Sequence, residues 1–175
     1  MKAWIRPIKK LGACSEALEW AEDYDNLQDA WDKCERGDWM LWLLGKQAGI
    51  PESDSRKKLV LAACQCARLT LPYVKEGEGR PLKAIETAEA WAHSEGGVTL
   101  IDVRDAAYSA YAAAYAAYSA YAAAYAAYAA YSAYATAYAA TAAAYAADDR
   151  TITLKQCADI VRGYYATVNL NNEEG

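Results

Sequence analysis

The segment from Ala106 to Ala147, called here the Ala/Tyr run, constrains the fold more than any other part of the chain. Its 42 residues are 26 alanines, 11 tyrosines, three serines and two threonines, without a charge, a Gly or a Pro. Ala is the strongest helix former and nothing in the run signals a helix end, so the composition predicts helix throughout. The run is also a degenerate repeat. The decapeptide YSAYAAAYAA fills 108–117 and 118–127, and after a three-residue insertion (128–130) it returns at 131–140 with one Thr in place of Ala.

The tyrosine spacing and the length of the run both bear on what could cover it. The spacing averages 3.33 residues between Tyr108 and Tyr138, so on one helix the stripe slips by about 27° per Tyr. One flat partner could not cover such a stripe, whereas a wrapping partner or several partners could. A straight helix of this length would be about 63 Å long, against roughly 40 Å for a compact domain of this size. The helix must therefore bend, break, protrude or be covered by another copy, and we expect a homo-oligomer.

Two other interpretations of the run were considered. A membrane span is disfavoured, because the run has no Leu, Ile, Val or Phe and its tyrosines recur every turn instead of at the two ends. The other interpretation is low-complexity helix in which Tyr fills packing gaps. We expect this for most of the eleven rings, with a binding wall of stacked Tyr formed by a minority.

Length and charge indicate one acidic domain. The 175 residues form a single domain with a Trp-rich helical part (1–98), a long repeat helix (99–147) and a C-terminal helix with a frayed tail (148–175). The net charge of −5 argues against binding to DNA or to an anionic membrane and is compatible with a basic protein partner.

The five cysteines indicate reduced thiols. The N-terminus has no apolar signal core, so we expect a cytoplasm. Cys64 and Cys66, two apart on a helix, would point about 200° away from each other. They therefore predict neither a disulfide nor a zinc pair, and all five cysteines are expected to be small buried apolar residues.

The remaining patterns predict an all-α bundle of about seven helices organised around the long Ala/Tyr-rich helix, which could bend or break. Residues 1–10 are expected to be a short lead-in in which Pro7 ends any regular element. The other helices are expected over 12–23, 27–34, 38–49, 54–73, from Pro81 onward, from a Thr99-x-x-Asp102 capping box, and after Asp149. Expected caps include Asn26, Asp38, Asp54 or Ser55, and Thr151 or Thr153.

Polar residues on apolar helix faces give the first site candidates. Arg68 lies in an apolar stripe, so it needs a carboxylate or an anionic ligand opposite it, and a structural ion pair is favoured. Glu86, Glu89 and His93 share a helix face, but with one His in the chain a solvated acidic face is favoured over a metal site. No cofactor or metal is expected. No catalytic motif is present, which indicates a non-enzyme.

The aromatic residues are the positive signal for binding. The chain has six Trp and 15 Tyr but no Phe, and such rings dominate interfaces. Trp20, Trp31, Trp42 and Trp91 are predicted to be core. The candidate ligand-binding or partner-binding residues are Trp39, Arg68, Arg80, Glu86, Arg104, Tyr108, Tyr111 and Tyr115.

Several segments resemble the Imm5-like immunity protein family of bacteria and of phage or prophage genomes. They are ACSEALEW (13–20), LQDAWDKCERGDWMLWLL (27–44), KLVLAACQCARL (58–69), RPLKAIETAEAWA (80–92) and QCADIVR (156–162). The family also has an Ala-rich helical region where this chain has its Tyr repeat. The resemblance implies an immunity role in toxin systems, without family-wide catalytic residues to transfer. The dense Tyr pattern departs from the family.

Three functional hypotheses follow. The first, favoured by the resemblance and the acidic charge, is an inhibitor that binds a toxin or defence effector. The second is a phage-type sponge for a nucleotide immune signal, with Tyr and Trp stacked on the base and Arg68, Arg80 or Arg104 on the phosphates. The third is a Tyr/Ala helix that only drives self-assembly.

Overall fold

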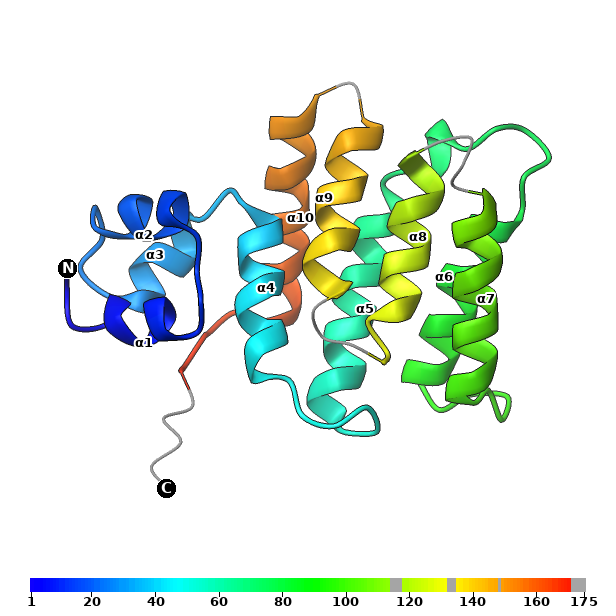
Figure 1. The fold of residues 1–175 in the computed structure, drawn as a ribbon, viewed down its shortest axis with the longest axis horizontal. Coiled ribbons are helices and arrows are strands. Elements are labelled where there is room, and N and C mark those ends of the chain that lie inside the picture. The colour runs from blue at the N-terminus through cyan, green and yellow to red at the C-terminus, as the bar shows by residue number, and fades with distance from the viewer. Residues whose placement is uncertain (114–117, 132–134, 148, 171–175) are drawn as a thin grey trace.

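The chain folds into helices joined by short loops (Figure 1). The computed structural model describes residues 1–113, 118–131, 135–147 and 149–170, and within these ranges all regular structure is helical, which confirms the predicted fold class. The described residues form ten α-helices and one 3₁₀ turn, against about seven helices predicted. They are α1 (Ile5–Lys10), α2 (Ser15–Ala21), α3 (Leu27–Lys33), α4 (Gly37–Gln47), α5 (Asp54–Arg68), η1 (Leu71–Tyr73), α6 (Arg80–Ala92), α7 (Leu100–Ala113), α8 (Tyr118–Tyr128), α9 (Ala135–Ala146) and α10 (Arg150–Tyr164).

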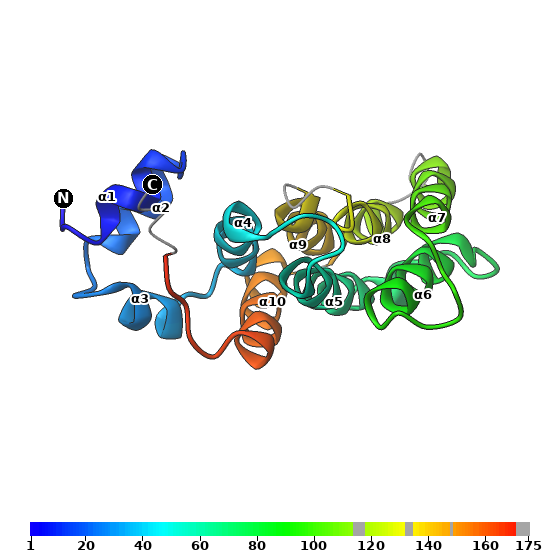
Figure 2. The ribbon, with the colours of Figure 1, turned by 90° about the horizontal axis from the view of Figure 1, so that it is seen from below.

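The helices from α4 to α10 alternate in direction (Figure 1) and form two layers (Figure 2). One layer holds α4, α9, α8 and α7 side by side, and the other holds α10, α5 and α6. The three short helices α1 to α3 lie beyond α4 at one end. Apolar side chains fill the space between the layers, with Val60 and Ile85 in one cluster and Leu41 and Leu59 in a second. The arrangement leaves the outer side of the α4–α9–α8–α7 layer as a broad surface.

The Ala/Tyr run breaks, which is one of the outcomes expected from its length. It occupies the end of α7 and all of α8 and α9, so the argument for an oligomer from a single 63 Å helix no longer applies. The end of α8 falls at the three-residue insertion. There the N–H of Ala130 bonds the carbonyl of Ala127 at 3.1 Å, and that of Tyr131 bonds the carbonyl of Tyr128 at 2.9 Å. These i to i+3 bonds satisfy carbonyls at the helix end without a glycine.

Burial of alanine explains why a break is favoured over a continuous helix. In α8, Ala122, Ala123, Ala124, Ala126 and Ala127 are all fully buried, and the small methyl groups let neighbouring helices approach closely. Packing of a helix face contributes more to helix stability than propensity does. Folding the run back on itself therefore buries alanine surface that one extended helix would leave in water. Tyr131 lies in the turn after α8, and its hydroxyl links that turn to α7 by donating a hydrogen bond to the Leu100 carbonyl.

Several helix starts follow the predicted capping chemistry. Asn26 accepts a hydrogen bond from the Asp29 N–H at 2.9 Å and caps α3. The capping box that opens α7 is confirmed, because the Thr99 N–H donates to Asp102 Oδ2 at 2.8 Å and the Asp102 N–H to Thr99 Oγ1 at 3.3 Å. In both cases a side-chain oxygen satisfies an N–H that the helix leaves unpaired.

Other predicted starts and ends were wrong by a few residues. Ser53 caps α5 instead of Asp54 or Ser55, and Asp149 caps α10 instead of Thr151 or Thr153. Pro7 does not end a regular element but lies in the first turn of α1, where its missing N–H has no helical partner to lose.

Asp38 is a further correction, because it does not cap α4. It lies in the first turn and binds the Arg36 guanidinium instead, at 2.9 Å from Nε and 2.8 Å from Nη2. Both nitrogens of one edge of the guanidinium are thereby paired with one carboxylate, a geometry that arginine favours.

A close approach of α4 and α10 positions the N-terminal helices. A Cβ at Gly37 would lie 2.4 Å from Cys157 Cβ, so only glycine fits there. The Trp31 indole N–H donates to the Tyr165 carbonyl at 2.8 Å, and Arg162 Nη1 donates to the Cys34 carbonyl at 2.7 Å. These bonds attach α3 to the end of α10.

Candidate functional site

The outer side of the α7–α8–α9 layer carries a continuous set of tyrosine rings. In these helices the tyrosines recur every three or four residues and therefore share one side, which faces outward, while many of the alanines are buried. Tyr108, Tyr111, Tyr138 and Tyr145 are 59%, 39%, 41% and 54% exposed. We call this surface the aromatic face, and its rings are those of Tyr108, Tyr111, Tyr121, Tyr125, Tyr128, Tyr138 and Tyr145. The stripe does not wind around one helix here, because the run is divided among three helices that present these tyrosines to the same side.

The rings of the aromatic face contact one another across helices. Tyr108 packs edge-on against Tyr128 with centroids 5.5 Å apart, and Tyr111 packs edge-on against Tyr121 at 5.2 Å. Burial, together with the neighbouring Tyr108, raises the pKa of Tyr128 to about 12. These contacts hold the rings in fixed orientations and fix the antiparallel register of α7 and α8.

Three rings lie nearly parallel across α8 and α9. Tyr121 and Tyr125 have centroids 6.3 Å apart and planes 23° apart, and Tyr125 and Tyr138 are 5.3 Å and 30° apart. Parallel-offset arrangements of this kind are favourable for aromatic rings. They also present planar surfaces on which another planar group could stack.

Two grooves meet on this side of the molecule. The α8–α9 groove has a volume of about 260 Å³ and is lined by Tyr121, Tyr125, Tyr138, Thr141, Ala142 and Tyr145. The α4–α9 groove has a volume of about 250 Å³ and is lined by Gly12, Ala13, Cys14, Ala17, Asp38, Trp39, Trp42, Ala137, Tyr138 and Thr141. Tyr138 and Thr141 belong to both grooves, so the two grooves adjoin at α9, and we call them together the aromatic channel.

Guanidinium groups of the chain itself stack on rings of both grooves. The Arg36 guanidinium lies 4.2 Å from the centroid of Trp39, and that of Arg150 lies 4.6 Å from Tyr145. Arg36 is also paired with Asp38 and, at 3.1 Å, with Glu16. The hydrogen bond to Asp38 raises the pKa of Arg36 above its ordinary value, so this cation is firmly held.

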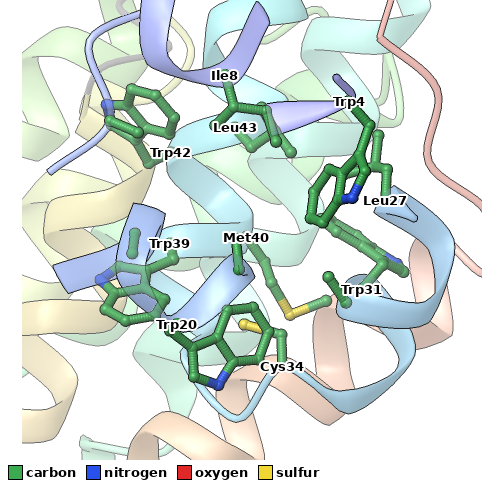
Figure 3. A pocket seen from close by; sticks show the side chains of 14 residues that line it. Trp4, Ile8, Trp20, Leu27, Trp31, Cys34, Trp39, Met40, Trp42 and Leu43 are labelled. Atoms are coloured by element: carbon green, nitrogen blue, oxygen red, sulfur yellow. The ribbon is translucent and has the colours of Figure 1, made fainter. Parts of the chain in front are cut away.

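Most of the tryptophans surround a separate apolar cavity between α1–α3 and α4 (Figure 3). The cavity has a volume of about 70 Å³, and its lining includes Trp4, Trp20, Trp31, Trp39 and Trp42. Trp31 is buried and Trp20 packs edge-on against Trp39 at 5.8 Å. The cavity therefore belongs to the packing of the N-terminal helices, as predicted for Trp20, Trp31 and Trp42. Trp39 lines both this cavity and the α4–α9 groove.

Arg68 has the carboxylate partner that its position required. Its Nε donates to Glu89 Oε1 at 2.8 Å and its Nη2 to Glu89 Oε2 at 2.5 Å, across α5 and α6. This hydrogen bond raises the pKa of Arg68. Glu86 and His93 line the same polar hollow, and both are exposed. Among the described residues, no group of His, Cys, Asp and Glu could hold a metal ion.

The remaining candidates lie elsewhere. Arg80, the first residue of α6, pairs with Glu78, its Nε donating at 2.8 Å. Arg104 pairs with Asp105 at 3.0 Å. Since α6 and α7 are antiparallel neighbours (Figure 1), these two arginines lie toward opposite ends of the pair. Tyr115 lies outside the described residues.

The structure adds rings that the prediction left out. Tyr125, Tyr138 and Tyr145 line the grooves together with Thr141, yet they were not among the candidates. The signal that could have indicated them is the three-residue insertion, because it marks the turn that brings the second and third copies of the decapeptide together.

Four of the five cysteines are buried, and the fifth, Cys14, lies in the lining of the α4–α9 groove. All five are free, and Cys34, Cys64, Cys66 and Cys157 are buried as predicted, whereas Cys14 is exposed, which corrects that part of the prediction. Burial raises the pKa of Cys34 to about 11 and raises that of Cys64 further. The buried thiols therefore behave as small apolar side chains.

Comparison with known proteins identifies the family. The model of the family described as Imm-5 like putative immunity protein matches residues 49–160, which is most of the chain. The chain belongs to this family, and the match covers the helices from α5 to α9 and most of α10. Searches of curated proteins and of solved structures returned no match. Within the described ranges, every helix falls short of the length and apolar character that a membrane crossing requires.

Proposed function

We propose that this member of the Imm5-like family neutralises a basic bacterial toxin or defence effector by binding it, without catalysis, and that the aromatic face is the binding surface. The family description supports an immunity role in general. The observation that carries the proposal is the α8–α9 groove of the aromatic channel, whose lining is uncharged and where exposed Tyr138 and Tyr145 lie on a layer of packed helices. Tyr and Trp are enriched among the residues that dominate binding energy.

Charge supports the choice of a basic partner. The chain has a net charge of −5, and the Ala/Tyr run contributes no charge at all. An acidic protein attracts a basic one over distances of roughly 10 Å at moderate salt, which speeds association. A large uncharged patch then allows close contact without leaving an unpaired charge buried.

The arrangement of arginines gives less support to a nucleotide sponge. Arg68, Arg80 and Arg104 each hold a different carboxylate, from Glu89, Glu78 and Asp105. A phosphate would have to displace these pairs one by one, so these three arginines do not form a ready group of guanidinium donors for phosphate. The homo-oligomer expected from the sequence remains a prediction that now rests on the exposed rings alone.

The test is native mass spectrometry of the tagged chain purified from cells that carry an active toxin or antiphage system. The wild type is compared with a Tyr138→Asp/Tyr145→Asp variant and with Tyr73→Asp, an exposed tyrosine in η1 outside the face. Circular dichroism checks that all three are equally helical. We expect a stoichiometric complex with a basic protein for the wild type and for Tyr73→Asp, and none for the double variant.

Immunity itself is tested by growth. Expression of the captured protein alone should stop growth, and the wild-type chain should restore it while the double variant should not. Three results would overturn the proposal: added mass of a few hundred daltons in place of a protein, a homo-oligomer with nothing bound, or a double variant that protects as well as the wild type.

A further inference from the structure

Arg56, in the first turn of α5, carries a buried charge that neither the aromatic face nor the polar hollow uses. The residue is 7% exposed. Its Nη2 donates to the Gly49 carbonyl at 2.8 Å, whereas Nε and Nη1 are buried without a hydrogen-bond acceptor. We propose that Arg56 binds a small anion through these unpaired N–H groups, beneath the loop that joins α4 to α5. This site is separate from the aromatic face, and the inference does not rest on the proposed function.

Other arginines of the chain show what a half-buried guanidinium requires. Arg68 pairs with Glu89 at 2.5 Å and Arg162 with Asp159 at 2.6 Å, although the two arginine side chains are still 33% and 23% exposed. Arg56 is buried more deeply than either, yet no carboxylate of the described residues pairs with it. It cannot avoid the cost of burial by losing its proton, because a guanidinium stays charged in proteins. Water would satisfy the N–H groups but would leave the charge unpaired, so a bound anion is the better occupant.

The position of Arg56 in its helix adds to the attraction for an anion. The N-terminal end of α5 carries a partial positive charge, which favours anions and disfavours cations. Lys57 and Lys58 follow Arg56 in the sequence, and the carboxylates nearest in the chain, Glu52 and Asp54, belong to exposed residues. Burial lowers the pKa of Arg56, and no neighbouring charge opposes that effect. An anion at the guanidinium would therefore be attracted by the side chain and by the helix end together.

The loop over Arg56 limits the size of the anion. The Gly49 carbonyl accepts from Arg56, and the Gly49 N–H donates to Ser55 Oγ at 3.2 Å, so the loop is tied to the first turn of α5. Gly49 and Ile50 are exposed, and an ion that passes this short loop reaches the guanidinium from solvent. The space around Nε and Nη1 is closed to solvent, which favours an ion about as small as a water molecule. Chloride has that size, whereas a nucleotide phosphate does not.

The experiment compares thermal unfolding of the full chain in sodium chloride and in sodium gluconate, followed by circular dichroism. Equal ionic strength in the two salts keeps screening the same, and gluconate is too bulky for the site. The line width in chloride NMR measures binding of the ion directly. Arg56→Met removes the charge and keeps apolar bulk, and Arg56→Gln is a second uncharged variant. Arg6→Met, at an exposed arginine in α1, is the matched control.

We expect the wild type and Arg6→Met to melt about 2–4 °C higher in chloride than in gluconate, because an ion that binds only the folded state stabilises it. Both should broaden the chloride line. Arg56→Met and Arg56→Gln should melt at the same temperature in the two salts and should not broaden the line. In gluconate, Arg56→Met should be at least as stable as the wild type, since it replaces a buried unpaired charge by an apolar side chain.

Three results would overturn the anion site. A wild type that neither gains stability in chloride nor broadens its line binds no such ion, and this result needs no variant to fold. An equal response of wild type and Arg56→Met would place the ion elsewhere on the protein. A loss of stability in Arg56→Met that is the same in both salts would mean that the guanidinium is satisfied without an anion. Capture of a protein partner by the aromatic face is a separate measurement, so the proposed function stands or fails independently.

Discussion

Tyr125 of α8 and Tyr138 of α9 stack with centroids 5.3 Å apart and planes 30° apart, and each is the third tyrosine of its copy of the decapeptide. Tyr111 and Tyr121, which are the second tyrosines of the first two copies, also contact each other, at 5.2 Å. The repeat thus forms interfaces between equivalent rings of adjacent copies. Its function in the fold is to supply helices that pack against one another.

The Tyr125–Tyr138 stack predicts a measurable coupling between the two side chains. In a double-mutant cycle with Tyr125→Ala and Tyr138→Ala, the free energies of unfolding should be non-additive by about 0.5–1.5 kcal/mol, because the first substitution already removes the pair. Urea denaturation followed by circular dichroism measures this. Tyr108→Ala with Tyr138→Ala, on α7 and α9, is the additive control. Additivity within about 0.3 kcal/mol for both pairs would mean that the stack contributes nothing.

Much of the fold could be predicted because local rules and burial agree over most of the chain. Asn26, Thr99 and Asp102 cap as expected, and Arg68 has a carboxylate partner because an unpaired guanidinium in an apolar stripe is costly. These inferences depend on a few neighbouring residues or on a single energetic requirement, so one sequence is enough.

The break of the Ala/Tyr run could not be located by the same rules. No Gly or Pro marks it, and propensity alone favours one helix. The break depends on tertiary burial of alanines such as Ala123 and Ala143 between layers, which requires knowing where α5 and α6 lie. The aromatic channel depends on it in turn, since Tyr138 meets Trp39 and Trp42 only after the chain has folded back.

The Arg68–Glu89 pair predicts non-additive mutational effects. Arg68→Met leaves a carboxylate that is 17% exposed without its partner, and Glu89→Gln leaves a guanidinium that is 33% exposed. Each should lower the free energy of unfolding by about 1–2 kcal/mol, which is modest because the pair is partly solvated. Arg68→Met/Glu89→Met should cost less than the sum of the single changes. If neither single change alters the urea midpoint, the pair contributes nothing to the free energy of unfolding.

Gly37 predicts a steric effect where α4 meets α10. An alanine Cβ there would lie 2.4 Å from Cys157 Cβ and 2.7 Å from the backbone nitrogen of Ala158. Backbone cannot yield as a flexible side chain can, so Gly37→Ala should lower stability by about 1–3 kcal/mol. Gly163→Ala is the matched control in α10, because no atom lies within 4 Å of its Cβ position, and it should be neutral or slightly stabilising. Equal stability of the two variants would show that α4 and α10 do not approach so closely.

Alkaline pH should destabilise the fold, because it deprotonates buried tyrosine hydroxyls and a buried cysteine thiol that are neutral at lower pH. Burial raises the pKa of Tyr165 to about 12, that of Tyr128 to about 12 and that of Cys34 to about 11. The folded state therefore holds these protons more tightly than the unfolded chain, where thiols and phenols ionise near pH 8.5 and 10. This contribution to stability is fully present below the unfolded values and is lost as pH rises through the folded ones.

The expected result is a urea midpoint that falls steadily between about pH 9 and 12. Tyr165→Phe and Cys34→Ala should each flatten that fall, because a side chain that cannot ionise loses no stability on deprotonation. Absorbance at 295 nm, which follows phenolate formation, should show a late-titrating fraction that shrinks in Tyr165→Phe. Tyr73→Phe, at an exposed tyrosine, should leave both the slope and the late fraction unchanged. A wild-type midpoint that is flat across this range would contradict the burial of these groups.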